Sequence, residues 1–370
     1  MTRSVIRAPL AAVLVVATAA ALTLAGSLTP ARASISVSPS SMTANNGSVN
    51  IAVNGPNNSL MFYWAASGSS TWNAETVAGP GTTYSSPSMT VIGNVVDIVA
   101  VGPDHSLMLY WAVNGSSTWN AETVVGSGNA FSAPSITPDG NTVDIVAMGP
   151  VNSLILYWAI NGDSTWHDET VQPAVTTFSA PSITVAGNDV YIAYEGIANE
   201  LDVEWAVNGS YTWHFEVLPA PAFQVVNFAP GMAANGNTVD VTYCDGQGQL
   251  KFLWSVDGSS TWTVENVAGP GTTFSAAPIA VNNGTITIAA TSPQDQLMFY
   301  WAAIGTGTWN AETVAGASST LSSPSITANG NAANISAIGP GNELDFYWAL
   351  DGTSAWHAET ITGGVGLPLP

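Results

Sequence analysis

Short runs of alternating residues, separated by turn residues, recur along the chain. One repeat shows four such runs, at residues 131–136, 142–147, 153–160 and 165–171. The Asn161-Gly162 pair before the last run is typical of a tight hairpin turn, which needs positive φ angles. Within the third run, Leu154, Leu156 and Trp158 share one face. Both faces are mostly apolar, which predicts a four-stranded antiparallel sheet that packs against neighbours on both sides.

The pattern repeats seven times, and tryptophan marks each repeat. The 14 tryptophans form seven pairs: Trp64/Trp72, Trp111/Trp119, Trp158/Trp166, Trp205/Trp213, Trp254/Trp262, Trp301/Trp309 and Trp348/Trp356. The spacing between pairs is 47 residues, except for 49 between the fourth and fifth pairs, and a Glu follows each second Trp at the third position. A period near 47 in an all-β pattern is typical of a propeller blade. We therefore predict an all-β fold, a seven-bladed β-propeller with four antiparallel strands per blade.

The terminal repeats resemble the central ones. A solenoid would need distinct capping repeats, so this likeness favours a closed ring. The first repeat begins at its first strand and the last repeat ends at its fourth. The sequence thus leaves open how the ring closes without a strand shared between the two ends.

The N-terminus has the features of an export signal. Arg3 and Arg7 precede an apolar stretch over residues 10–28, and Ala31-Arg32-Ala33 fits a signal-peptidase site. We predict that residues 1–33 are a signal peptide and that residues 34–370 form a single propeller domain, secreted to the extracellular space. A membrane anchor is the alternative, because the apolar stretch approaches spanning length. No later stretch is apolar enough to enter a membrane.

Charge excludes several classes of partner. After residue 33 the chain holds one basic residue, Lys251, against 25 acidic residues. Nucleic acids need Lys and Arg to displace their counterions, so nucleic-acid binding is excluded. Anionic membranes and sulfated glycans are disfavoured for the same reason. A neutral sugar needs no basic residue and stays a possible partner, and whether the ring forms a homo-oligomer stays open.

Aromatic and polar residues that repeat with the blades are the candidate binding groups. An indole offers a flat apolar face to a sugar ring, while amide, imidazole and carboxylate groups bind its hydroxyls. The candidates are the second tryptophans, their polar neighbours and a tyrosine before the first tryptophan: Trp72, Trp119, Trp166, Trp213, Trp262, Trp309, Trp356, Asn73, Asn120, His167, His214, Asn310, His357, Tyr63, Tyr110, Tyr157, Tyr300 and Tyr347. The alternative is structural: the second Trp packs between blades, and the Glu accepts hydrogen bonds from turn amides. The first tryptophans are expected in the core.

The repeats resemble the blades of bacterial seven-bladed propeller lectins of the fucose-binding type. The likeness is carried by residues 96–111, by Thr118-Trp-Asn-Ala-Glu122 and by Phe131-Ser-Ala-Pro134, and it extends over all seven repeats. It implies small sugar sites in the clefts between adjacent blades, lined by aromatic residues, and binding without catalysis.

The fourth repeat differs from the others by its acidic residues. Glu200, Asp202 and Glu204 lie on one strand face at a period of two. They fit a solvated strand edge, a Ca²⁺ site built from oxygen ligands, or a carboxylate pair for glycoside hydrolysis. No catalytic motif accompanies them, so we predict no catalytic residue and no cofactor other than this candidate Ca²⁺.

Taken together, the sequence predicts a secreted, multivalent, non-enzymatic propeller that recognises neutral glycans or glycoconjugates by aromatic stacking between blades. Two alternatives stay open: a secreted glycoside hydrolase that uses the fourth-repeat carboxylates, and a protein-binding or spacer propeller.

Overall fold

The computed structural model describes residues 38–365 except for residues 46, 211, 219–227 and 363. All of them belong to the unit formed by residues 35–370. The predicted signal peptide lies outside the described residues and stays a prediction. Among the residues described, no helix has the length and apolar character that a membrane span would need.

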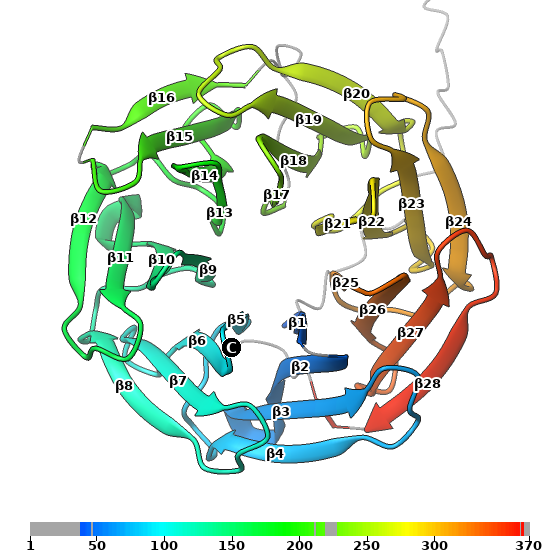
Figure 1. The fold of residues 1–370 in the computed structure, drawn as a ribbon, viewed down its shortest axis with the longest axis horizontal. Coiled ribbons are helices and arrows are strands. Elements are labelled where there is room, and N and C mark those ends of the chain that lie inside the picture. Colours follow the sequence, from blue (N-terminus) through cyan, green and yellow to red (C-terminus); the bar gives the residue numbers. More distant parts are fainter. Residues whose placement is uncertain (1–37, 46, 211, 219–227, 363, 366–370) are drawn as a thin grey trace, which may run out of the picture. The chain divides into compact units, whose positions relative to one another are not determined.

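Seven four-stranded antiparallel sheets are arranged in a ring around a central axis (Figure 1). Each sheet, or blade, consists of four strands that are consecutive in sequence, from the innermost strand a to the outermost strand d. The seven-bladed propeller predicted from the tryptophan repeat is thereby confirmed. Blades 1 to 7 are numbered along the chain, so blade 1 contains β1–β4 and blade 7 contains β25–β28.

The strands are short and regular. The a strands are β1 (Ser41–Asn45), β5 (Ser88–Ile92), β9 (Ser135–Asp139), β13 (Ser182–Ala186), β17 (Gly231–Asn235), β21 (Ile279–Asn282) and β25 (Ser325–Asn329). The b strands are β2 (Ser48–Gly55), β6 (Val95–Val101), β10 (Thr142–Met148), β14 (Asp189–Glu195), β18 (Thr238–Cys244), β22 (Thr285–Thr291) and β26 (Ala332–Ile338). The c strands are β3 (Ser59–Ala66), β7 (Leu107–Val113), β11 (Leu154–Ile160), β15 (Leu201–Val207), β19 (Leu250–Val256), β23 (Leu297–Ala303) and β27 (Leu344–Leu350). The d strands are β4 (Asn73–Ala78), β8 (Asn120–Val125), β12 (His167–Gln172), β16 (His214–Val217), β20 (Thr263–Ala268), β24 (Asn310–Ala315) and β28 (His357–Thr362). Single 3-10 turns, η1 (Pro56–Asn58) and η2 (Pro150–Asn152), connect strands b and c in blades 1 and 3.

The hydrophobic core lies between the blades. Strands b and c are largely buried, because both of their faces pack against a neighbouring blade. One core cluster combines Val99 and Leu107 of blade 2 with Ile136 and Ile145 of blade 3. The predicted sheet with two apolar faces is therefore confirmed, and each blade depends on its neighbours to bury its apolar surface.

The ring closes without a shared strand. In blade 1, β1 lies beside β25 of blade 7. The Trp72 indole Nε1 of blade 1 donates a hydrogen bond to Glu359 Oε2 of blade 7 at 3.0 Å. The Ser40 and Ser336 hydroxyls are 2.8 Å apart at the same junction. The two ends are joined by side-chain packing and hydrogen bonds, which answers the question that the sequence left open.

This closure predicts a local effect of Trp72→Phe. The change leaves Glu359 without its indole partner, and we expect a loss of about 1–2 kcal/mol in the free energy of unfolding. Because no linker joins blades 7 and 1, the amides of β1 and β25 should exchange faster with deuterium. The matched change Trp119→Phe, between covalently connected blades, should leave that exchange unchanged. Equal exchange of β1 and β25 in the two variants would contradict this account of closure.

Candidate functional site

The second tryptophan of each pair links neighbouring blades. It lies directly before strand d, is half-buried, and points toward the preceding blade. Six of these indoles donate an Nε1 hydrogen bond of 2.8–3.1 Å to a Glu of the preceding blade. The six pairs are Trp72–Glu359, Trp119–Glu75, Trp213–Glu169, Trp262–Glu216, Trp309–Glu265 and Trp356–Glu312. The predicted inter-blade packing of this Trp is thus observed.

The Glu of strand d has an indole partner rather than a turn amide. Glu75 accepts one hydrogen bond from Trp64 of its own blade at 3.3 Å and another from Trp119 of the next blade at 2.8 Å. The same double contact occurs at Glu216 and Glu265. The expectation that turn amides bind this carboxylate is wrong, because the two indoles occupy its oxygens. Glu75, Glu216 and Glu265 therefore each hold two tryptophans at one blade junction.

The polar residues beside the second tryptophans lie over the first ones. Asn73, Asn120, His167, His214, Asn310 and His357 are exposed at the start of strand d. The imidazole of His167 stacks on Trp158 with ring centroids 4.1 Å apart, and His214 and His357 repeat this contact. The three Asn side chains donate to the backbone carbonyl of the first Trp at 3.4 Å. The three His rings therefore cover the first tryptophans from outside, and the three Asn side chains are bound to the backbone of theirs.

The five candidate tyrosines lie in the blade cores. Tyr63, Tyr110, Tyr157, Tyr300 and Tyr347 are 2–7% exposed. Tyr157, for example, packs among apolar residues of blade 2 and donates to the Asn129 carbonyl at 3.4 Å. A ring that is buried on both faces offers no surface for stacking, so the expected sugar contact is corrected here to a packing role.

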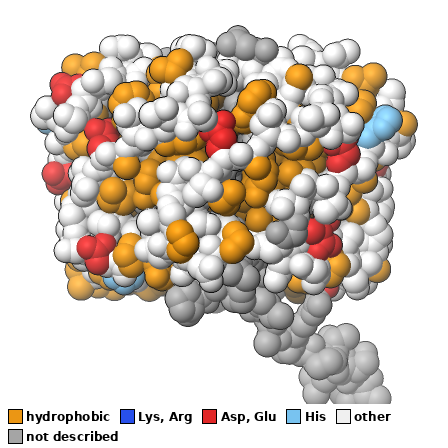
Figure 2. Space-filling view, turned by 90° about the horizontal axis from the view of Figure 1, so that it is seen from below, with side chains coloured by type: hydrophobic (Ala, Val, Ile, Leu, Met, Phe, Trp, Pro, Cys, Tyr) orange, Lys and Arg blue, Asp and Glu red, His pale blue; other side chains and the backbone are white. Residues whose placement is uncertain are grey.

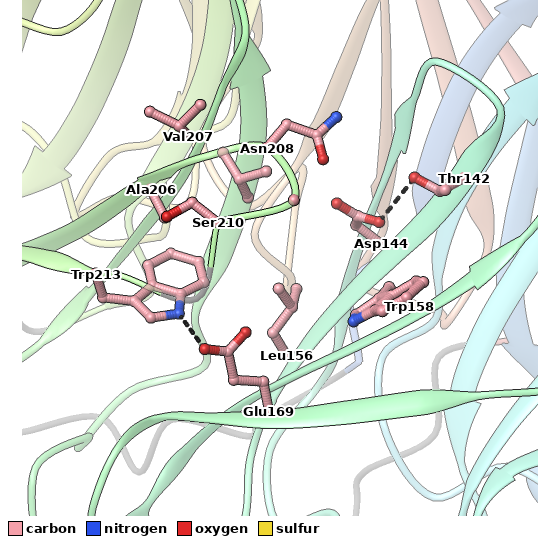
Figure 3. Close-up of a pocket in the computed structure, with 12 residues that line it drawn as sticks. Thr142, Asp144, Leu156, Trp158, Glu169, Ala206, Val207, Asn208, Ser210 and Trp213 are labelled. Carbon is pink, nitrogen blue, oxygen red and sulfur yellow. Dashed lines mark hydrogen bonds between the residues drawn. The ribbon is translucent and has the colours of Figure 1, made fainter.

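Two of the first tryptophans, Trp111 and Trp158, line open clefts, although the sequence placed all seven in the core. Trp158 of blade 3 and Trp213 of blade 4 border a cleft of about 130 Å³. Asp144, Leu156 and Glu169 of blade 3 line the same space (Figure 3). The loop between strands c and d of blade 4 completes it with residues 207–210. We call this space the 3/4 cleft.

An equivalent cleft lies between blades 2 and 3. It has a volume of about 160 Å³, and Trp111 and Trp166 border it. Its acidic residues are Asp97, Glu122 and Asp163. We call this space the 2/3 cleft. In both clefts the two indoles come from adjacent blades. One is the first tryptophan of its blade, and the other is the second tryptophan of the next blade.

One position in strand c distinguishes these clefts from others. Leu109 and Leu156 line the 2/3 and 3/4 clefts two residues before the first Trp. At four other junctions the same position carries Phe, whose ring packs edge-on against the second Trp of the next blade at 4.9–5.3 Å. These residues are Phe62, Phe252, Phe299 and Phe346. A leucine in place of the phenylalanine leaves the space that forms the cleft.

The junction of blades 4 and 5 is filled in another way. Tyr191 replaces the cleft Asp of strand b, and its ring stacks near Trp205 with centroids 6.2 Å apart. Its hydroxyl donates to Asp257 at 3.0 Å and accepts a hydrogen bond from the Gly258 amide at 2.9 Å. The phenol therefore spans the junction between the two blades.

The strand-b carboxyls of the two clefts are buried. Asp97 is 2% and Asp144 is 4% exposed. Burial, with a smaller contribution from the nearby Glu122, raises the pKa of Asp97 to about 7. Burial also raises the pKa of Asp144 to about 7, with a smaller contribution from Asp139 and an opposing one from the Thr142 hydroxyl. Asp97 Oδ2 has no hydrogen-bond partner within the protein, so a bound ligand would complete its bonding.

The fourth-repeat carboxylates are not at a solvated edge. Asp202 is 4% exposed and Glu204 is fully buried on β15, an interior strand of its sheet. Glu204 accepts hydrogen bonds from the Gln172 amide and, at 3.3 Å, from the Tyr194 hydroxyl. Burial and the neighbouring Glu200 raise the pKa of Asp202 to about 7.

No group of three or more His, Cys, Asp or Glu in the described ranges has a geometry suited to a metal ion. The expected Ca²⁺ site at Glu200, Asp202 and Glu204 therefore has no geometric support. Hydrolysis by these residues would require a substrate to reach Asp202 and Glu204, which are buried.

The surface shows little basic character. Figure 2 shows acidic side chains scattered among uncharged ones on the face in view. Lys251, the basic residue of the propeller region, is 6% exposed and donates to Asn266 Oδ1. Cleft carboxylates therefore meet no cationic side chain among the residues that line the two clefts.

Comparison with known proteins supports the fold. No family profile matches the chain, and no curated protein matches its sequence. The structure is similar to the BP39L lectin of Burkholderia pseudomallei, with 18% identity, a TM-score of 0.77, and coverage of 88% of this chain and 99% of that one. It is also similar to the six-bladed, fucose-recognising lectin of Aleuria aurantia, with 13% identity, a TM-score of 0.52, and coverage of 74% and 93%.

A third likeness is to a prolyl endopeptidase structure, with 14% identity and a TM-score of 0.57. The match covers 89% of this chain but only 50% of that one. At these identities each likeness concerns the fold. The resemblance to propeller lectins seen in the sequence is therefore confirmed for the architecture, and the cleft residues decide the chemistry.

Proposed function

We propose that this protein is a secreted, non-enzymatic glycan-binding propeller whose sites are the 2/3 and 3/4 clefts. The observation that carries the proposal is the composition of each cleft: two indoles from adjacent blades, two or more carboxyls, and a hollow between them. Indole faces stack on the C–H faces of a pyranose, and carboxyl oxygens bind its hydroxyls. The fold likeness to lectins adds support, because the Aleuria lectin recognises fucose with the same kind of architecture.

The ligand carries no anionic groups. The lining residues include no Lys or Arg, whereas a sulfate, phosphate or carboxylate would have to approach two carboxyls in a confined space. Two clefts on one rigid ring would also bind a glycan with repeated units more tightly than a single cleft would. The gain from such bivalence reaches about 10²–10⁴ when the spacing of the units matches.

The test compares two double variants with the same chemistry. Trp166→Ala/Trp213→Ala removes one indole from each cleft, and Trp309→Ala/Trp356→Ala removes equivalent indoles from Phe-filled junctions. We expect the wild-type protein and the second variant to be retained on the same members of a panel of immobilised glycans. The first variant should lose at least about tenfold in affinity.

Each double variant loses two inter-blade indoles, so the two control for each other in stability, which thermal melting would monitor. Loss of retention in both variants to the same degree would place the effect in folding rather than in the clefts. Absence of wild-type binding across the panel would remove the proposed function.

A further inference from the structure

The two clefts combine aromatic faces with carboxyl groups that have no cationic side chain beside them in the lining. Asp97, Glu122 and Asp163 line the 2/3 cleft, and Asp144 and Glu169 line the 3/4 cleft. Glu169 is bound by the Trp213 indole at 3.0 Å, but an indole carries no charge. Like charges in a partly enclosed space of low dielectric raise the local electrostatic energy. Each cleft would therefore be stabilised by a ligand that brings positive charge.

An unpartnered atom in the 2/3 cleft shows where such a ligand would bind. Asp97 Oδ2 is buried without a hydrogen-bond partner. The Trp166 indole is directed at Glu122 and lowers the pKa of that carboxyl against the larger effect of burial. The free acceptor of the cleft is therefore the Asp97 carboxyl, and leaving it unmatched costs free energy. A ligand with a cationic donor would match it.

The 3/4 cleft has the same arrangement with different partners. One oxygen of Asp144 accepts a hydrogen bond from the Thr142 hydroxyl at 3.2 Å. Figure 3 shows the Asp144 carboxyl between the Asn208 loop and the indole of Trp158, on the opposite side of the cleft from Trp213 and Glu169. A ring placed between the two indoles would have carboxyls on both sides.

We propose that the 2/3 and 3/4 clefts select glycans whose sugar rings carry a free, protonated amino group, as in a partly or fully deacetylated amino-sugar polymer. This inference rests on the proposed glycan-binding function and specifies its ligand class. The ammonium donates to Asp97 or Asp144 and lies near the indole faces, to which a cation is attracted.

The amine distinguishes this ligand from an ordinary neutral sugar. A hydroxyl can also donate to Asp97, but it leaves the negative charge of the cleft in place. An ammonium neutralises it, and hydrogen bonds between charged groups are roughly twice as strong as neutral ones. Acetylation of the amine would remove both the charge and the donors of the ammonium.

The experiment uses three β-1,4-linked oligosaccharides of equal length, made of glucosamine, N-acetylglucosamine or glucose. Their binding to the mature protein would be measured by calorimetry near neutral pH. We expect the glucosamine oligomer to bind about tenfold or more tightly than the other two. In Asp97→Asn/Asp144→Asn, which retains the shape of both side chains, that preference should disappear.

Two further variants test whether the effect is specific to the cleft carboxyls. Asp240→Asn changes the equivalent buried residue at the junction of blades 5 and 6, where Phe252 packs against Trp309, and it should keep the full preference. Asp163→Asn changes an exposed turn residue of the 2/3 cleft. It avoids any folding problem of the buried pair and should reduce the preference for the amine about two- to threefold.

The outcomes separate the two proposals. Equal binding of the three oligomers, or an unchanged preference in Asp97→Asn/Asp144→Asn, would overturn the selection for amines while glycan binding stands. Tryptophan-dependent binding of uncharged glycans with no preference for the amine would have the same meaning. If none of the oligomers and no other glycan binds, the proposed function fails as well.

Discussion

Leu156→Phe should close the 3/4 cleft and abolish ligand binding there. The larger ring would occupy the hollow beside Trp213, as Phe62 does beside Trp119, where the two ring centroids are 5.1 Å apart. We expect calorimetry to show loss of one of two binding sites, with at least a tenfold loss of affinity at the altered cleft. The hollow already exists, so overpacking should cost less than the usual ~1–3 kcal/mol.

The reverse change should open a new cleft. At the junction of blades 5 and 6, Phe252 is 2% exposed beside Trp309. The other cleft residues are already present there, because Asp240 is buried and Glu265 accepts hydrogen bonds from Trp254 and Trp309. Phe252→Leu should therefore add a binding site at a cost of less than about 1.5 kcal/mol in the free energy of unfolding.

Both variants together test the rule that one strand-c residue decides which clefts are open. A binding stoichiometry that falls in Leu156→Phe and rises in Phe252→Leu supports it. Unchanged stoichiometry in both variants, with folding intact, would show that the ligand does not enter these clefts.

The repeat made the architecture predictable, whereas the site depended on contacts between blades. The nearly constant spacing of the seven tryptophan pairs and the turn residues of each repeat were enough to predict four strands per blade, because those features act locally. The partner of Trp119 is Glu75, which lies 44 residues earlier and in another blade. No local pattern indicates a contact between residues so far apart in the sequence. For this reason turn amides were expected to donate hydrogen bonds to the Glu.

The sequence also did not show that a first tryptophan could line a cleft. Alternation placed Trp158 on the face of Leu154 and Leu156, which is correct, but that face is not buried along the whole strand. Leu154 is fully buried, while Trp158 lines the 3/4 cleft. The sequence does contain the signal that distinguishes the open clefts. This signal is a Leu instead of a Phe two residues before the first Trp, together with an Asp in strand b. Its effect on the cleft becomes clear only when the second Trp of the neighbouring blade is in place.

The buried carboxyls predict that the fold loses stability as the pH rises. Burial raises the pKa values of Asp97, Asp144, Glu195, Asp202 and Asp240 to about 7. In an unfolded chain such groups titrate near pH 4. Between these values the folded protein holds protons that the unfolded chain releases, so unfolding becomes easier with each step in pH. The stabilisation from these protons is fully present below about pH 4 and is lost as the pH passes through about 7.

Melting temperatures measured at about pH 5 and about pH 8 should therefore differ by roughly 10 °C, with the higher value at the lower pH.

The Asp202→Asn variant distinguishes the effect of a buried carboxyl on stability from the effect of the protein's general negative charge. The amide keeps the shape of the side chain, which lies outside the two clefts, and cannot ionise. We expect the variant to be more stable than the wild type at pH 8 by about 1–3 kcal/mol, and nearly equal to it at pH 5. Substitution of the exposed Asp168 with Asn removes the same charge from the surface. If Asp168→Asn raised the melting temperature at pH 8 as much as Asp202→Asn did, repulsion among surface charges would be the cause, and burial of Asp202 would not.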